Sequence, residues 1–191
     1  AQIGKLLDTL EQEGLSEKTI VVFCSDNGYN LGQHGMWKKQ ALFEHTTRVP
    51  LIISVPGVTV GEGKTSRVVE LLDIYPTLAE ICGLKHTPRD LDGQSLLPLL
   101  KDTEAPWEGA AYSLVLRVAN PTLTYMKKGE RAMGRSIRVD RYRYTEWDEG
   151  AKGGELYDYV ADPNEFNNLY NNPKYKKLQE ELRTKLHAKY K

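Results

Sequence analysis

The sequence predicts an α/β domain followed by a small antiparallel β-sheet subdomain with a C-terminal helix. An amphipathic helical pattern leads into an apolar, β-rich run at 19–24, and helix followed by buried strand is the α/β pattern. Later runs alternate β-branched and aromatic residues with polar ones, which is typical of a sheet with two unlike faces. The composition changes near 101–107, so we divide the chain into domains 1–105 and 106–191.

The first domain is predicted from three apolar patterns. One helix face collects Ile3, Leu6, Leu7 and Leu10. The continuous run from Thr19 to Cys24 suits a strand that is buried on both faces, as in a parallel sheet. A short strand between prolines is expected at 50–57, and a helix at Asp73 to Cys82 with Asp73 as its N-cap.

The second domain is predicted from period-two runs and one last helix. The runs are Tyr112 to Val118, Ser136 to Trp147 and Glu155 to Tyr159. In the middle run, alternation from Ile137 to Glu146 predicts one strand with two faces. The helix is expected from about Pro173 to Tyr190, because Leu178, Leu182 and Leu186 recur every four residues.

Charge and cysteine content exclude several classes of function. The 191 residues carry 26 basic and 26 acidic side chains, which gives no bulk attraction for nucleic acid or an anionic membrane. No apolar stretch approaches the ~20 residues that span a bilayer. Cys24 and Cys82 make no disulfide framework, and we expect both to be buried. The chain opens within a predicted helix, so we expect it to begin inside a longer protein.

The Asp26-Asn27-Gly28 sequence follows the first predicted strand. Ligand sites in open α/β sheets lie beyond the carboxyl ends of strands. A carboxylate and an amide oxygen are hard donors that suit Ca²⁺ or Mg²⁺, and Gly28 permits the chain to leave strand geometry. The same three residues also form an ordinary turn sequence, so the pattern alone supports both interpretations.

Three further side chains in this polar segment are candidates for chemistry. Lys39 can bind a sulfate or phosphate oxygen and stabilise developing charge, although a solvated surface lysine has the same pattern. His34 and His45 can transfer protons or contact substrate. A histidine that is hydrogen-bonded to the backbone is an equally good interpretation of either position.

Four blocks of sequence, in order, together resemble one known family. They are SDNGYNLGQHGMWKKQALFEHTTRVPLIISVPG, ELLDIYPTLAEICGL, DLDGQSLLPLL and ELYDYVADPNEFNNL. The first resembles the second signature block of sulfatases, closest to the iduronate-2-sulfatase-like branch of the alkaline phosphatase superfamily. The others are similar to blocks that follow in that family, so the resemblance covers nearly the whole chain.

The resemblance implies the C-terminal part of an alkaline-phosphatase-like α/β sulfatase domain, with the small antiparallel sheet and terminal helix beside it. It implies hydrolysis of a sulfate ester on a sulfated sugar or glycan, through a formylglycine made from Cys or Ser outside this chain. Asp26 and Asn27 match Ca²⁺ ligands, Lys39 matches the sulfate-binding lysine, and His34 matches a position that faces substrate. The implied partners are a sulfated carbohydrate and the N-terminal part of the catalytic domain. The implied location is secreted, periplasmic or lysosomal.

The chain departs from the family at the nucleophile. No Cys/Ser-x-Pro/Ala-x-Arg motif is present, and the early Asp pair of the Ca²⁺ site is also absent. We therefore expect the chain alone to be inactive. We also expect it to bind Ca²⁺ poorly, because two ligands fall short of the roughly six to eight oxygens that the ion prefers.

Two other functions stay open. The first is a phosphodiesterase or phosphonate hydrolase of the same superfamily, since Asp-Asn disfavours only the two-zinc branch. The second is a non-catalytic module that binds glycan or forms a homo-oligomer. Its binding face would comprise Arg141, Tyr142, Arg143, Tyr144 and Trp147. The sequence favours a second interpretation of the same residues, as cross-strand pairs that hold a small sheet together.

Overall fold

The computed structural model describes residues 2–88, 90–118 and 129–190, which form two compact units. Unit 1 comprises Ala1–Ser25, Pro50–Thr65 and Leu71–Trp107. Unit 2 comprises Asp26–Val49, Ser66–Glu70 and Glu108–Lys191. Residues 26–49, called the 26–49 segment below, thus belong to the unit that holds the C-terminal sheet. The predicted domain boundary after residue 105 stays a prediction, because compact units need not coincide with domains.

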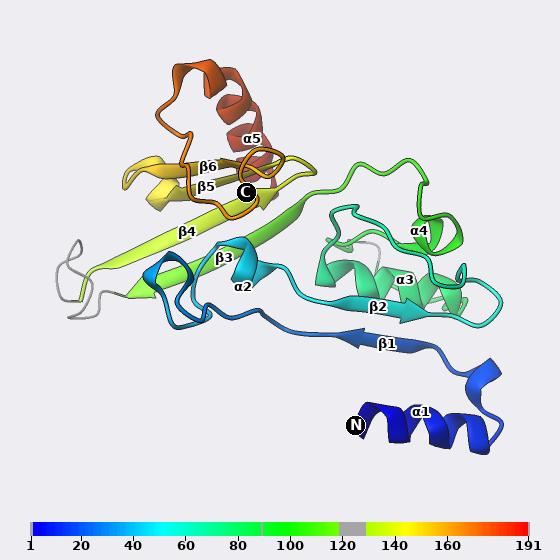
Figure 1. The fold of residues 1–191 in the computed structure, drawn as a ribbon. Helices are drawn as coiled ribbons and strands as arrows, with labels where there is room; N and C mark the ends of the chain where they lie inside the picture. Colours follow the sequence, from blue (N-terminus) through cyan, green and yellow to red (C-terminus); the bar gives the residue numbers. More distant parts are fainter. Residues whose placement is uncertain (1, 89, 119–128, 191) are drawn as a thin grey trace. The chain divides into compact units, whose positions relative to one another are not determined.

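Unit 1 contains short helices and one pair of strands (Figure 1). Its elements are α1 (Gln2–Gln12), η1 (Ser16–Lys18), β1 (Val21–Cys24), β2 (Leu51–Ser54), η3 (Leu71–Asp73), α3 (Ile74–Ile81) and α4 (Leu97–Lys101). The helix predicted from Ile3 to Leu10, the strand predicted at 50–57 and the helix predicted at 73–82 are therefore confirmed as elements.

The prediction of a doubly buried strand in a parallel sheet is wrong for β1. Within the described residues, β1 pairs only with β2, and the pairing is antiparallel, with Val21 opposite Ser54 and Cys24 opposite Leu51. Because the sheet has two strands, the side chains of Phe23 and Cys24 stay accessible. Both cysteines are exposed free thiols, which also corrects the prediction that Cys24 and Cys82 are buried.

Asp73 does not cap α3 with its side chain as predicted. The residue already has right-handed helical backbone angles, because η3 leads directly into α3. Its carboxylate instead accepts a hydrogen bond from the backbone N–H of Gln94 at 2.8 Å. Thr77, one turn later, accepts one from the backbone N–H of Leu96, also at 2.8 Å. These two buried side chains fix the segment before α4 on α3.

Unit 2 is built on a four-stranded antiparallel sheet in the order β3-β4-β5-β6, which confirms the predicted antiparallel architecture (Figure 1). Its elements are η2 (Gln33–Gly35), α2 (Glu44–Thr47), β3 (Ala111–Val118), β4 (Arg131–Arg138), β5 (Tyr142–Trp147), η4 (Asp148–Gly150), β6 (Gly154–Asp158), η5 (Pro173–Tyr175) and α5 (Lys176–Lys189). The predicted terminal helix is confirmed as η5 and α5.

The run predicted as one strand at 136–147 is two strands joined by a hairpin. The backbone N–H of Val139 donates to the carbonyl of Tyr142 at 2.9 Å, which closes the turn. Uninterrupted alternation would put Ile137 and Tyr144 on opposite faces of the sheet. They are instead direct partners across the hairpin, so they share one face.

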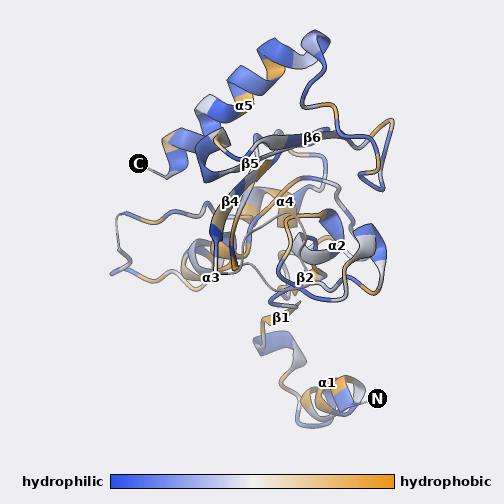
Figure 2. Ribbon diagram, turned by 90° about the vertical axis from the view of Figure 1, so that its left-hand side faces the viewer, coloured by the Kyte–Doolittle hydropathy of each residue, from blue (hydrophilic) through white to orange (hydrophobic). Residues whose placement is uncertain are grey.

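Each face of this sheet is covered by a different part of unit 2. One face carries Ile137, Tyr144 and Leu156, which pack against Leu182 and Leu186 of α5. In Figure 2, α5 is largely hydrophilic with isolated hydrophobic positions, as expected for a helix with one buried side. The opposite face is covered by the 26–49 segment, whose Leu42 is buried against Ala132 and Trp147 of the sheet.

Gly134 of β4 is required by the packing of Leu42 against Trp147 on this face of the sheet. A Cβ on Gly134 would lie 2.7 Å from the Trp147 ring and 2.8 Å from Leu42 Cδ1. Such contacts are too short for carbon atoms, so the glycine lets Leu42 and Trp147 meet over the sheet. No helix among residues 2–88, 90–118 and 129–190 is long and apolar enough to cross a membrane.

Truncation of Leu186 tests the packing of α5. Because this side chain is fully buried against the sheet, Leu186→Ala should lower the free energy of unfolding by about 2–5 kcal/mol. Lys185→Ala, at an exposed position of the same helix, should change it by less than about 0.5 kcal/mol. Urea unfolding followed by circular dichroism measures both, and equal losses would contradict the assigned core.

Candidate functional site

The four site residues that the family resemblance implies lie in the 26–49 segment of unit 2, as does the further candidate His45. The segment folds back on itself through two backbone hydrogen bonds, from Asn30 N–H to Lys38 O at 3.1 Å and from Gly32 N–H to Met36 O at 2.9 Å. The turn between them uses left-handed backbone angles at Gly32, His34 and Gly35. Glycine adopts these angles at little cost, but histidine does so rarely, so His34 is held there by its surroundings.

The Asp26-Asn27 pair stands at a bend directly after β1, with Asp26 exposed and Asn27 half-buried. The next residue is fixed to α2, because the Gly28 N–H donates to Thr46 O at 3.0 Å. A Cβ on Gly28 would overlap the carbonyl oxygen of His45, so only glycine allows this close approach. The chain has already left strand geometry after Cys24, before Gly28, and the physical reason for a glycine at this position is its contact with α2.

The donors of this bend fit a hard cation in kind but supply only part of a site. Asp26 offers a carboxylate and Asn27 an amide oxygen, which Ca²⁺ and Mg²⁺ accept. Within the described parts of the chain, no group of three or more His, Cys, Asp or Glu residues is arranged to hold a metal. The remaining ligands of a Ca²⁺ ion would have to come from elsewhere.

His34 is half-buried and lies against aromatic rings. Its imidazole stacks on Phe43 at a centroid distance of 3.8 Å and an angle of 6°. His45 and Phe166 lie at 6.2 and 5.8 Å. The Nε2 atom is buried and has no hydrogen-bond partner within residues 2–88, 90–118 and 129–190. Burial lowers the pKa of His34 below 6.5, although Glu165 opposes part of that shift.

Lys39 and Lys38 differ in their surroundings. Lys39 is exposed, whereas Lys38 is half-buried and its carbonyl accepts the Asn30 hydrogen bond. An exposed ammonium on a structured turn is available to an anionic ligand. The structure thus places His34 and Lys39 in one folded-back segment, and it brings His34 together with Phe43, His45 and Phe166.

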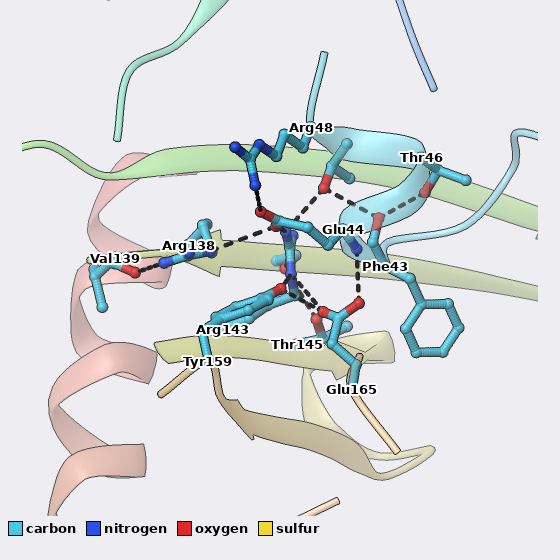
Figure 3. A network of polar contacts seen from close by, with 12 residues as sticks. Phe43, Glu44, Thr46, Arg48, Arg138, Val139, Arg143, Thr145, Tyr159 and Glu165 are labelled. Atoms are coloured by element: carbon cyan, nitrogen blue, oxygen red, sulfur yellow. Dashed lines mark hydrogen bonds and ion pairs between the residues drawn. The ribbon is translucent and has the colours of Figure 1, made fainter. Parts of the chain in front are cut away.

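A buried network beneath the segment contains residues that sequence reasoning did not assign to the site (Figure 3). Arg143 of β5, which is 2% exposed, donates from Nη2 to Glu44 Oε2 at 2.6 Å and to Thr47 Oγ1 at 2.8 Å. Its Nε lies 3.0 Å from Glu165 Oε1 and donates to Tyr159 Oη at 2.7 Å. Glu165 Oε2 accepts the backbone N–H of Glu44 at 2.7 Å.

The charges of this network support one another. Burial raises the pKa of Glu44, but Arg143 and Arg138 outweigh it and hold that pKa below its ordinary value. Burial lowers the pKa of Arg143, yet neighbouring oxygens raise it above its ordinary value, so the guanidinium stays charged. The sequence signal for this network was the ELYDYVADPNEFNNL block, which contains Tyr159 and Glu165, but nothing local marks Arg143 as its partner.

The basic and aromatic face that would bind glycan is not formed. Arg143 and Trp147 point to the face that holds the 26–49 segment, whereas Tyr144 points to α5. All three are buried. Arg141 is bound to Asp158 through two hydrogen bonds of 2.9 and 2.6 Å. The alternative interpretation, cross-strand packing within a small sheet, is the one that these positions support.

Comparison with known proteins gives one family and several relatives. Residues 32–191 match the family described as N-sulphoglucosamine sulphohydrolase, C-terminal. A sulfatase of Formosa agariphila is 35% identical over 97% of this chain and 33% of the relative. Human iduronate 2-sulfatase is 34% identical over 89% of this chain and 42% of the relative. The chain thus spans about a third of the length of the first of these relatives.

Solved structures are similar over nearly the whole chain. A protein in complex with its substrate D-glucosamine-2-N,6-O-disulfate matches with a TM-score of 0.81 and 32% identity, over 97% of this chain and 37% of that chain. The phosphonate monoester hydrolase of Agrobacterium radiobacter matches with a TM-score of 0.79 and 27% identity, over 99% of this chain and 38% of that chain.

The stacked environment of His34 predicts a measurable titration. Its midpoint in an NMR titration should lie below 6.5, and Phe43→Ala should move it upward by admitting water. Because the pKa of His34 is lower in the folded protein, the unfolded chain binds the proton more readily. The contribution of neutral His34 to the free energy of unfolding is therefore complete above pH ~6.5 and is lost as pH falls through the folded pKa. Val160→Ala, at an exposed position of the same unit, is the control. A wild-type midpoint at or above 6.5 would contradict the partial burial of the His34 ring.

Proposed function

Because this chain belongs to the sulfatase family, as an N-sulphoglucosamine sulphohydrolase C-terminal domain, we propose that it forms part of an enzyme that hydrolyses a sulfate ester of a sugar. The predicted fold class, the C-terminal part of an alkaline-phosphatase-like α/β sulfatase domain with an antiparallel sheet and terminal helix, is confirmed by the solved structures that it matches. The single observation that carries the proposal is the 26–49 segment, which holds Asp26, Asn27, His34 and Lys39 on one anchored turn structure.

The proposed roles follow from the chemistry of each side chain. Asp26 and Asn27 would provide two oxygen ligands to Ca²⁺, which when bound would neutralise charge on the sulfate. Lys39 would hold a sulfate oxygen with its ammonium and stabilise charge that develops as the ester bond breaks. The lowered pKa of His34 keeps its imidazole neutral at pH 7, so it can exchange a proton or a hydrogen bond with the departing sugar hydroxyl.

The nucleophile would be a formylglycine outside residues 1–191. No residue of this chain stands in a Cys/Ser-x-Pro/Ala-x-Arg motif. The substrate class that we propose is a sulfated carbohydrate, by analogy with the disulfated glucosamine bound to the similar solved structure. The isolated chain is proposed to be inactive and to need the N-terminal part of the catalytic domain as its partner.

A phosphonate monoester hydrolase is the second candidate, and the likeness to the Agrobacterium radiobacter enzyme favours it. Asp26 and Lys39 would serve a phosphonate as well as a sulfate, since both are tetrahedral oxyanions. The two reactions differ in the released product, so an assay of product decides between them.

The test uses the intact protein and matched aryl sulfate and aryl phosphonate esters, with and without a chelator. Sulfate release that the chelator abolishes would support the proposal, with the isolated 191-residue chain inactive. Phosphonate hydrolysis without sulfate release would favour the second candidate. An active isolated chain would contradict the proposed position of the nucleophile.

Adjacent lysines provide a matched pair of variants. Lys39→Ala should reduce kcat/KM roughly a hundredfold to a thousandfold, because one charge-stabilising donor is lost. Lys38→Ala removes the same charge one residue earlier, from a half-buried side chain, and should leave kcat/KM within about threefold because no transition-state contact is removed. Equal losses in the two variants would refute the assignment of Lys39.

A further inference from the structure

We propose that the buried pair of Arg143 and Glu165 is a positioning device that fixes α2 on the sheet and thereby sets the placement of the Asp26-Asn27 bend and the His34 ring. The part of this inference that concerns calcium rests on the proposed function. Neither Arg143 nor Glu165 is proposed to touch substrate or metal, and both act through α2.

The first step is the anchoring of α2 at both ends. Glu165 accepts the backbone N–H of Glu44, the first residue of α2, at 2.7 Å. Arg143 binds the Glu44 carboxylate at 2.6 Å and the hydroxyl of Thr47, the last residue, at 2.8 Å. A helix of four residues is too short to be stable by itself. Its position and direction therefore depend on these side chains (Figure 3).

The second step joins α2 to the bend that holds the candidate metal ligands. Thr46 of α2 accepts the N–H of Gly28 at 3.0 Å. The His45 carbonyl lies so close to Gly28 that no Cβ fits. Asp26 and Asn27 immediately precede this contact, so a shift of α2 would displace the backbone that carries both oxygen donors.

The third step joins α2 to His34. Phe43 occupies the position before α2, and its carbonyl accepts the N–H groups of Thr46 and Thr47 at 2.9 and 3.1 Å. The ring of Phe43 stacks on His34 at 3.8 Å. The same short helix therefore holds the metal-ligand bend through Thr46 and the imidazole through Phe43.

Charged groups suit this role better than apolar ones because their contacts are directional. The Arg143 and Glu165 side chains are 2% and 0% exposed, and each makes several hydrogen bonds of defined direction. Glu165 also has a left-handed backbone angle, with φ of 57°, which is costly for a residue with a Cβ. An apolar contact of equal area would permit α2 to slide or rotate, whereas this pair specifies its orientation.

The test compares two buried glutamates of unit 2. Glu165→Gln keeps the shape of the side chain but replaces one carboxylate oxygen by an amide NH₂ group, which donates hydrogen bonds. The variant side chain therefore cannot accept from both the Glu44 N–H and Arg143. Glu146→Gln is the matched control, because Glu146 is equally buried and binds His187 at 2.6 Å and Arg183 at 3.6 Å on α5. Glu146 faces away from the 26–49 segment.

Four measurements on the intact protein distinguish positioning from general stability: amide exchange, Ca²⁺ affinity, ester hydrolysis and Tm. Amide hydrogen exchange in peptides covering 26–42 should become about tenfold faster in Glu165→Gln, and Ca²⁺ affinity by calorimetry should weaken about tenfold. Excess Ca²⁺ should restore much of the lost sulfate-ester hydrolysis, because the ligands themselves remain. Glu146→Gln should lower Tm without changing exchange in 26–42 or Ca²⁺ affinity.

The proposal would be overturned if both glutamine variants changed 26–42 equally, or if Glu165→Gln changed neither readout. If Glu165→Gln does not fold, Arg143→Lys is compared with Arg141→Lys, whose arginine is half-exposed and bound to Asp158. Lysine keeps the charge of Arg143 but cannot reach all of its partners at once. If the unsubstituted protein binds no Ca²⁺, the proposed function fails, and the exchange comparison alone still decides whether the pair positions the segment.

Discussion

The structure of unit 2 depends on a guanidinium that is removed from water. Arg143 stands near the turn of the hairpin β4–β5, opposite Arg138, and its side chain is covered by the 26–49 segment. An unpaired charge in that position would cost several kcal/mol, so the fold requires acceptors around it. Glu44 and Thr47 supply them from one part of the chain, and Glu165 supplies another from 121 residues later. The packing of the segment on the sheet thus also supplies acceptors that Arg143 requires.

This constraint explains why a segment that lies between β1 and β2 in sequence belongs to the C-terminal unit. Leu42 contributes apolar packing against Trp147, which gives the segment affinity for the sheet but little direction. The ion pairs of Glu44 with Arg143 and Arg138 add that direction. The candidate site residues precede α2 in the same segment, so we infer that the attachment of α2 to the sheet also sets their placement. A site built in this way combines an accessible loop with a rigid base, which is the usual arrangement for functional loops.

Sequence patterns predicted those elements whose form depends on local periodicity. The leucine repeat of α5, the stripe of α1 and the period-two run of β3 each specify a helix or strand without reference to the rest of the chain. The predictions that failed concern features that depend on parts of the chain distant in sequence. The exposure of Cys24 depends on how many strands flank β1, and the burial of Arg143 depends on a carboxylate far away in sequence. Likewise the turn that separates β4 from β5 is Val139-Asp140-Arg141, which contains neither glycine nor proline, so the alternation appeared to continue through it.

The composition of the network also determines how it responds to change. Arg138, Arg143, Glu44 and Glu165 carry two positive and two negative charges, so the group is neutral as a whole. Removing one member leaves a buried charge without its counterion, which destabilises more than the contact itself contributed. Replacing a complete pair by apolar residues of similar volume avoids that penalty and can preserve the fold. It would nevertheless remove the directional contacts on α2, so stability and the placement of His34 and Asn27 are separable properties of this unit.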